Sequence, residues 1–152
     1  MILTENKYQN FHLLRCSGGV SYTETLTELS KYAIKEGLAK EGHTEALLAR
    51  EEQYPTGLMA NIGVAIPHAD EAYTQTGSII VALLEKSSRF KAMAGGGEVD
   101  SEVIFLLMID KPENQVKVLS NIVELIQDKT IAEKIKSPDI CEILKDRFQN
   151  FI

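Results

Sequence analysis

Three histidines are the residues of this sequence best suited to chemistry near neutral pH, because imidazole is the side chain that changes protonation there. One of them, His68, stands apart because Ile66 and Pro67 precede it at the end of a short apolar segment. Proline fixes its own φ and favours extended backbone in the residue before it, so we expect the imidazole on a stiff arm. Local context alone allows two interpretations: a functional imidazole, or a half-buried histidine hydrogen-bonded in a turn.

No motif for a metal or a bound nucleotide accompanies His68. The histidines are not spaced as in zinc-binding helices, and Cys16 and Cys141 do not form a CxxC pair, so we expect no metal site. The glycine-rich sequences that hold phosphates or dinucleotides are also missing, and we expect no cofactor. His12 and His43 are interpreted as bystanders, and both cysteines as structural residues.

Composition restricts the class of partner. The chain has 152 residues with 16 basic and 22 acidic side chains, and its net charge of −6 argues against nucleic-acid binding. No apolar run approaches the roughly 20 residues of a membrane helix, so direct membrane insertion is not expected. The N-terminal residues lack a secretory signal and the cysteines form no disulfide framework, so we expect a cytoplasmic protein.

Apolar residues at helical spacing predict helices along the chain, and local signals predict where they begin and end. The first predicted helix follows residues 21–23 and ends at Gly37, the second spans 44–53 and the third spans 112–127. The fourth begins near Thr130, and the fifth begins at Ser137 and Pro138. Pro55 stops the second helix because its ring excludes a helical continuation. Asp110 is expected to cap the helix over 112–127, and the T-x-x-E pattern of Thr130 and Glu133 to cap the next one.

Strand patterns place His68 at the end of a buried strand. Residues 62–66 are predicted to form a short strand, and the uninterrupted apolar runs at 78–84 and 103–109 predict central strands that helices bury on both faces. Helices and buried strands alternate, which predicts the α/β class, with one domain over residues 1–152 and a mixed β-sheet flanked by helices. Ligands in such sheets bind outside the carboxyl ends of strands, where His68 is expected.

Two neighbouring segments resemble the signature of a known family. Residues 48–58, LAREEQYPTGL, and residues 63–69, GVAIPHA, contain an R-E pair, a T-G pair and a G-x-A-I-P-H sequence. This combination resembles the enzyme IIA domains of the bacterial phosphoenolpyruvate-dependent sugar phosphotransferase system (PTS), of the fructose and mannitol type. The apolar run at 103–109 and the N-Q-V-K-V-L helix opening extend the resemblance over most of the chain. It implies the mannitol-type enzyme IIA fold, and the aromatic residue before Pro-Thr-Gly-Leu is similar to galactitol-specific members.

The resemblance implies a phosphorelay in which His68 is the active residue. The imidazole would take a phosphoryl group from the phosphohistidine carrier HPr and pass it to a cysteine of the IIB component. A neutral imidazole nitrogen is a good nucleophile near pH 7, which suits this role. By the family's example the reactive atom is Nε2, with the Nδ1–H held by a backbone carbonyl.

Three further residues receive site roles from the resemblance. Arg50 matches the arginine of the R-E pair and would hydrogen-bond the phosphoryl oxygens, the alternative being an ordinary solvated helix arginine. Thr56 could contribute its hydroxyl or N–H to the same oxygens, or simply serve the Pro-Thr-Gly turn. Gln115 occupies the place where mannitol- and fructose-type members often carry a second histidine. A glutamine can donate a hydrogen bond there but cannot titrate.

HPr and IIB are the expected partners, and sugar specificity lies in the membrane component IIC, with galactitol favoured by the resemblance. We expect an apolar rim around His68, and the charge of −6 suggests complementarity to basic surfaces on HPr or IIB. Two alternatives remain open. One is a regulatory IIA-like protein that is phosphorylated on His68 to control its binding of other proteins, and the other is an interaction module whose His68 is inert.

Cys16 allows one further interpretation, because the sequence RCSGG at 15–19 faintly resembles the cysteine phosphate loop of IIB domains. Such a loop would follow a long buried strand at the start of the domain, and the apolar segment at 12–14 is short. Cys16 is therefore interpreted as a structural residue.

Overall fold

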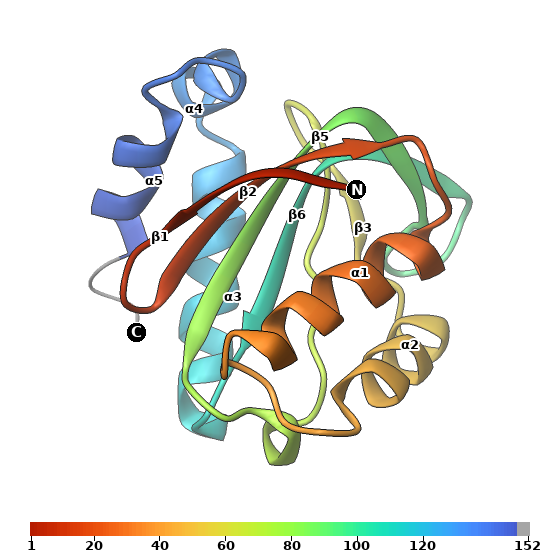
Figure 1. Cartoon of the computed structure of the whole chain (residues 1–152). Helices are drawn as coiled ribbons and strands as arrows, with labels where there is room; N and C mark the ends of the chain where they lie inside the picture. The colour runs from red at the N-terminus through yellow and green to blue at the C-terminus, as the bar shows by residue number, and fades with distance from the viewer. Residues whose placement is uncertain (149–152) are drawn as a thin grey trace.

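The computed structural model describes residues 1–148, which form one sheet with helices on both faces (Figure 1). The strands are β1 (Ile2–Lys7), β2 (Phe11–Gly18), β3 (Gly57–Met59), β4 (Gly63–Ala65), β5 (Ser78–Lys91) and β6 (Glu98–Met108). The helices are α1 (Tyr22–Lys35), α2 (His43–Gln53), α3 (Pro112–Ile126), α4 (Lys129–Lys134) and α5 (Ile140–Phe148), with a 3-10 helix η1 (Glu71–Tyr73). The six strands form a mixed sheet in the order β1-β2-β5-β6-β4-β3, which confirms the predicted fold class.

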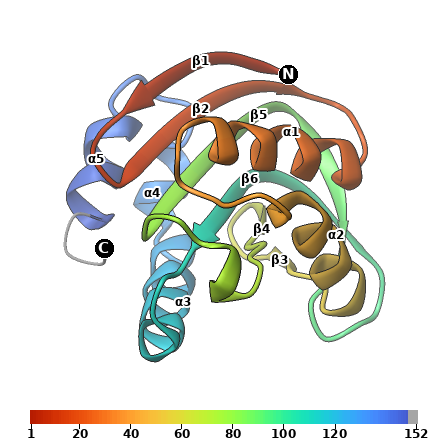
Figure 2. The same ribbon diagram turned by 60° about the horizontal axis from the view of Figure 1, so that its bottom comes forward.

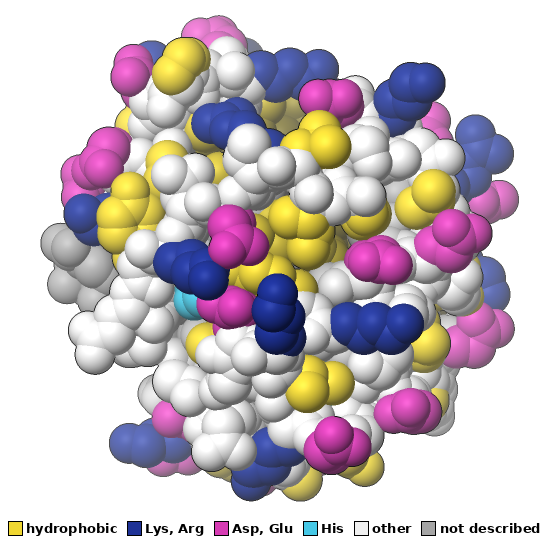
Figure 3. Space-filling model, viewed as in Figure 1, with side chains coloured by type: hydrophobic (Ala, Val, Ile, Leu, Met, Phe, Trp, Pro, Cys, Tyr) yellow, Lys and Arg dark blue, Asp and Glu magenta, His cyan; other side chains and the backbone are white. Residues whose placement is uncertain are grey.

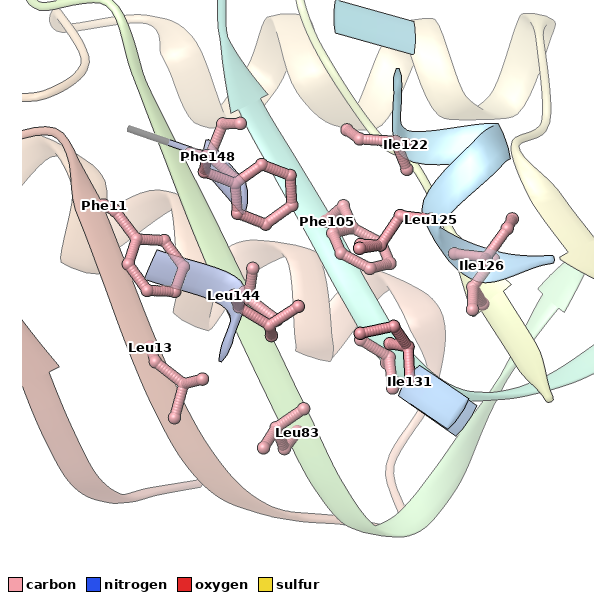
Figure 4. Close-up of a cluster of buried hydrophobic side chains, with 14 of the residues drawn as sticks. Phe11, Leu13, Leu83, Phe105, Ile122, Leu125, Ile126, Ile131, Leu144 and Phe148 are labelled. Atoms are coloured by element: carbon pink, nitrogen blue, oxygen red, sulfur yellow. The ribbon is translucent and has the colours of Figure 1, made fainter. Parts of the chain in front are cut away.

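Each face of the sheet carries its own hydrophobic core. Helices α1 and α2 cover one face and α3, α4 and α5 the other, and neighbouring strand residues such as Ile80 and Val81 point into different cores. Under α3–α5, Phe148 lies with its ring centroid 5.7 Å from that of Phe11 and 6.2 Å from that of Phe105 (Figure 4). Burial on both faces is the reason that the central strands have uninterrupted apolar sequences.

Strands β5 and β6 lie at the centre of the sheet, as the apolar runs predicted, and both extend beyond those runs. Residues 78–84 are buried, whereas exposed side chains appear in β5 from Glu85 onward. The apolar runs therefore mark only the part of each strand that helices cover on both faces. The remainder of β5 and β6 forms an antiparallel hairpin, and all three glycines at its tip, 95–97, have positive φ.

Two strands at the edges of the sheet were not predicted. Five of the six side chains of β1 are exposed, so no apolar alternation marks it as a strand. β3 spans only three residues and begins at Gly57, directly after the Pro-Thr sequence that favoured a turn. Edge strands bury few side chains, which leaves little signal in their sequence.

β2 is longer than the short segment expected at 12–14, because it runs for eight residues parallel to β5. The length of β2 therefore does not exclude a IIB-like loop, contrary to the expectation from residues 12–14. Cys16 is nevertheless fully buried within this strand, and burial raises the pKa of its thiol to about 11. A protonated, inaccessible thiol is not a nucleophile, so the structural interpretation of Cys16 is confirmed on this different ground.

The long helices form where helical spacing predicted them. α2 and α3 match the predicted ranges to within one residue at each end, and Gly37 ends α1 with a positive φ of 75°. The hydroxyl of Ser21 caps α1 by accepting a hydrogen bond from the N–H of Glu24 at 3.2 Å. Ser137 begins the turn that leads into α5, because its hydroxyl accepts the N–H of Asp139 at 3.0 Å.

Two predicted helix caps are wrong. α3 begins at Pro112, so the lysine before it takes the cap position and Asp110 stands one residue too early. Pro112 has no N–H of its own, and the backbone carbonyl of Lys111 accepts the N–H of Asn114 in the first turn at 3.0 Å. The carboxylate of Asp128 caps α4 by accepting the N–H of Thr130 at 2.9 Å. Thr130 therefore lies inside the first turn and does not form a capping box with Glu133.

The central position of β6 leads to a test of the fold. Leu106 is fully buried in the core beneath α1 and α2. We expect Leu106→Ala to lower the free energy of unfolding by about 2 to 5 kcal/mol, measured by urea denaturation, because it leaves a cavity between sheet and helices. Val116→Ala is the control, because Val116 is 74% exposed and should change stability little. A loss for Leu106→Ala no larger than that of the control would contradict a central β6.

Candidate active site

His68 lies at the end of the sheet where β4 and β6, which run parallel, both finish. The chain beyond β4 stays beside β6: His68 forms an isolated bridge with Leu107, whose N–H donates to the carbonyl of Pro67 at 3.1 Å. Helices α2 and α3 lie on either side of this segment (Figure 2). This is the edge at which α/β sheets place their ligands, as predicted.

The imidazole of His68 is held in one tautomer. Its Nδ1 lies 3.1 Å from the carbonyl oxygen of Ile66. A carbonyl can only accept, so Nδ1 carries the proton and donates it, and Nε2 keeps its lone pair. On the Nε2 side, the side-chain amide nitrogen of Gln115 lies 3.5 Å away, so the structure brings these two predicted site residues together.

The surroundings of His68 keep its imidazole neutral. The side chain is only 8% exposed, and burial is the main cause that lowers its pKa from the ordinary value of 6.5. The positive charge of Arg50 lowers the pKa further, whereas the hydrogen bond to Ile66 opposes both effects. A neutral imidazole with a free Nε2 is a nucleophile at neutral pH.

Arg50 belongs to the last turn of α2, and its guanidinium carbon lies 4.9 Å from the centroid of the Tyr54 ring. A cation over an aromatic face is attracted by the ring, and stacking leaves the N–H groups at the edge of the guanidinium. No carboxylate within residues 1–148 forms a salt bridge with Arg50. These N–H donors can therefore serve an incoming anion.

Thr56 makes its hydrogen bonds inside the protein. Its N–H and its hydroxyl both donate to the carboxylate of Glu51, at 2.7 Å and 2.9 Å. Its hydroxyl oxygen also accepts the N–H of Ile66 at 3.0 Å. A phosphoryl contact with Thr56 stays a prediction, and it would have to displace one of these bonds.

Glu51 and Tyr54 are site residues that the sequence reasoning missed. Both stood inside the quoted motif, in the R-E pair and before Pro-Thr-Gly, without a role. A signal for Glu51 exists in the helix pattern, because the buried residues of α2 include His43, Leu47 and Glu51 at intervals of four. A carboxylate on the buried side of a helix indicates a specific hydrogen-bond partner.

The other two histidines take part in core contacts away from His68. Nδ1 of His12 lies 2.8 Å from the hydroxyl of Tyr32, and Nδ1 of His43 lies 2.7 Å from the hydroxyl of Ser30. Burial lowers the pKa of His43 to about 4, so this ring stays neutral at physiological pH. Within residues 1–148, no three His, Cys, Asp or Glu side chains gather in a way that could hold a metal ion.

The fold and the site agree with one family of proteins. Residues 14–146 match the family model described as "Phosphoenolpyruvate-dependent sugar phosphotransferase system, EIIA 2". The chain therefore belongs to the PTS EIIA type-2 family, whose members are phosphocarriers with a phosphohistidine intermediate. The family predicted from the two sequence segments is confirmed.

Individual relatives agree with this family. The chain is 25% identical over 130 residues to the galactitol-specific EIIA component of Escherichia coli K12, covering 83% of this chain and 81% of the relative. Its fold resembles enzyme IIAMTL of Escherichia coli, solved in complex with phosphorylated enzyme IIBMTL, with a TM-score of 0.69 at 15% identity. That match covers 89% of this chain and 94% of the other. The nitrogen regulatory protein IIA-Ntr of Neisseria meningitidis has the same TM-score, 0.69, at 22% identity, with 92% and 93% covered.

None of the helices formed by residues 1–148 combines the length and the apolar character that crossing a bilayer requires.

The electrostatics of the site lead to a pH prediction. In an NMR titration of the imidazole, we expect His68 to titrate below 6.5, because burial and Arg50 both disfavour its protonated form. Arg50→Ala should raise this pKa, since a nearby positive charge is removed, and burial should still hold it below 6.5. Arg89→Ala on the exposed hairpin removes the same charge far from the site and should leave His68 unchanged. A His68 pKa that does not move in Arg50→Ala would place the guanidinium away from the imidazole.

Proposed function

We propose that Nε2 of His68 accepts a phosphoryl group from phosphorylated HPr and passes it to a cysteine of a IIB component. The observation that carries this proposal is the hydrogen bond from Nδ1 to the Ile66 carbonyl, which leaves Nε2 as the unprotonated nitrogen of a neutral ring. Family membership supports the same chemistry.

The transfer balances without a proton acceptor. The lone pair of Nε2 attacks phosphorus, the N–P bond to the HPr imidazole breaks, and its electron pair returns to that imidazole. The Nδ1–H of His68 stays donated to Ile66 throughout, so the positive charge that develops on the ring faces a carbonyl dipole. Transfer onward repeats the step, with the thiolate of IIB as the nucleophile. Such transfers need little from a protein beyond positioning and charge stabilisation.

Charge stabilisation falls to Arg50 and Gln115 in this proposal. The guanidinium, stacked on Tyr54, donates to the phosphoryl oxygens as a planar fork. The amide of Gln115, 3.5 Å from Nε2 before transfer, donates to an oxygen of the phosphoryl group afterwards.

Exposed hydrophobic side chains support a partner surface at this edge. Val116, next to Gln115, is 74% exposed, and Tyr54, against Arg50, is 55% exposed. They fit the expected apolar rim onto which HPr and IIB would dock in turn. The face shown in Figure 3 mixes acidic and basic side chains around exposed hydrophobic ones.

We infer a cytoplasmic role in the uptake of a sugar or sugar alcohol, with the sugar bound by the membrane component IIC. Galactitol is favoured by the similarity to galactitol-specific EIIA components, which is 25% identity. The alternative is a regulatory protein controlled by phosphorylation, because the fold is equally similar to IIA-Ntr. If purified galactitol IIB takes the phosphoryl group from the phosphorylated protein, the result supports transport. If no IIB component takes it, the result supports regulation.

Labelling tests the phosphorylation itself. With phosphoenolpyruvate, enzyme I and HPr, we expect one acid-labile phosphate per chain, and none on His68→Ala. His12→Asn is the matched control, because it changes a buried histidine that bonds Tyr32 instead, and it should label fully. An unlabelled wild-type protein, or a label that survives His68→Ala, contradicts the proposal.

Rapid-quench kinetics test the charge-stabilising groups. Arg50→Ala should slow phosphoryl transfer by about 100-fold, because it removes charged donors to the transition state. Gln115→Ala should slow it by only about 2- to 10-fold, the loss of one neutral hydrogen bond. Circular dichroism should be unchanged in both variants, and Arg89→Ala should transfer at the wild-type rate. Wild-type transfer in Arg50→Ala would remove Arg50 from the site.

A further inference from the structure

A chain of hydrogen bonds connects helix α2 with the imidazole of His68. It runs from the Glu51 carboxylate through the Thr56 hydroxyl to the N–H of Ile66, whose carbonyl accepts the Nδ1–H. We propose that Glu51 and Thr56 are positioning residues that hold His68 with its Nε2 free, an inference that rests on the proposed phosphoryl transfer.

The direction of this chain is set at Glu51. Its carboxylate accepts the Thr56 N–H at 2.7 Å on Oε2, and the Thr56 hydroxyl at 2.9 Å on Oε1 and 3.1 Å on Oε2. An ionised carboxylate can only accept, so the Thr56 hydroxyl must point its hydrogen toward Glu51. Its lone pairs are then free to receive the N–H of Ile66 at 3.0 Å.

Ile66 is the residue at which this anchoring matters. The ladder pairs of β4 end at Ala65, which pairs with Gly57 on one side and Ile104 on the other. Directly after the ladder, the Thr56 hydroxyl takes the N–H of Ile66, and the Ile66 carbonyl orients the imidazole. Without the Thr56 hydroxyl, the N–H of Ile66 loses this hydrogen bond, although the carbonyl of the same residue must still orient the imidazole.

The burial of Glu51 indicates that its carboxylate does more than stabilise the fold. Its side chain is 3% exposed, and within residues 1–148 it forms no salt bridge. Burial raises the pKa of Glu51, and the hydrogen bonds from Thr56 together with the charge of Arg50 oppose that rise. A hydrophobic residue at this buried place would avoid the desolvation cost. Only a carboxylate supplies two acceptor oxygens that face both donors of Thr56, its N–H and its hydroxyl.

The two residues of the R-E pair, Arg50 and Glu51, therefore have different roles. Arg50 is half-buried in the last turn of α2 and its charge acts on His68, whereas Glu51 is buried and holds the backbone at Thr56. The hydrogen bonds of Glu51 and Thr56 join them to each other and to Ile66 inside the protein, so neither residue is assigned a contact with a partner protein. Their effect on transfer must pass through His68.

The test compares Glu51→Gln, Thr56→Val and Thr56→Ser with the wild-type protein. ¹⁵N NMR of the neutral imidazole at pH 8 reports which nitrogen of His68 carries the proton. The wild type and Thr56→Ser should show Nδ1–H, because serine keeps the hydroxyl. In Glu51→Gln and Thr56→Val the Nε2–H tautomer should become populated. Their rate of phosphoryl transfer should fall by about 10- to 100-fold with KM for phospho-HPr unchanged.

Two matched controls separate positioning from general damage. Glu52→Gln removes a carboxylate from the adjacent residue, where it bonds Tyr22 and Lys91 on the surface. Thr25→Val removes a buried hydroxyl that lies 2.9 Å from Ser88, near the opposite end of β5. Both controls should keep the wild-type tautomer and the wild-type rate.

Each outcome decides the inference. If Glu51→Gln and Thr56→Val fold, keep Nδ1–H and transfer at the wild-type rate, the positioning role is overturned while the proposed function stands. If Thr56→Val does not fold, Glu51→Gln must lose the tautomer and Thr56→Ser must keep it, and any other result overturns the role. If the wild type accepts no phosphoryl group, the proposed function fails, and the tautomer measurement still decides the positioning of His68 because it needs no partner.

Discussion

The hydrogen bond between Nδ1 of His68 and the carbonyl of Ile66 is the interaction on which the site depends. It decides which nitrogen of the ring carries the proton, and it forms in the stretch of chain after β4 that stays beside β6, where His68 bridges Leu107. Pro67 keeps this stretch extended, since its φ is fixed and its carbonyl accepts the N–H of Leu107 in the central part of the sheet. The two hydrophobic cores pack on both faces of that central part and hold it rigid, so the orientation of the His68 imidazole depends on the whole fold.

The two helices beside His68 contribute different chemistry. α2 presents a cation and a buried carboxylate from consecutive residues, Arg50 and Glu51, and α3 presents the amide of Gln115. The proposed relay would accept and release a phosphoryl group with similar ease, which favours donors whose charge does not change with pH. Gln115 suits this demand where an additional histidine would make the site depend on a second protonation.

Sequence patterns predicted the parts of the molecule that are buried on both faces or that carry a compact motif. The runs at 78–84 and 103–109 predicted the central strands, and G-x-A-I-P-H predicted the place of His68. β1 and β3 escaped because edge strands bury few side chains, and Asp110 failed as a cap because a helix can begin on proline without one. Glu51 escaped because its partner is a hydroxyl five residues along, on a turn whose geometry no periodicity encodes.

The most direct test of the account is the position of phosphorus on the ring. ¹⁵N and ³¹P NMR of the ¹⁵N-labelled protein, phosphorylated by enzyme I and HPr, distinguishes the two imidazole nitrogens through their coupling to phosphorus. We predict coupling to Nε2 of His68, with the proton retained on Nδ1. Phosphorus on Nδ1, or on any other residue, would contradict the account.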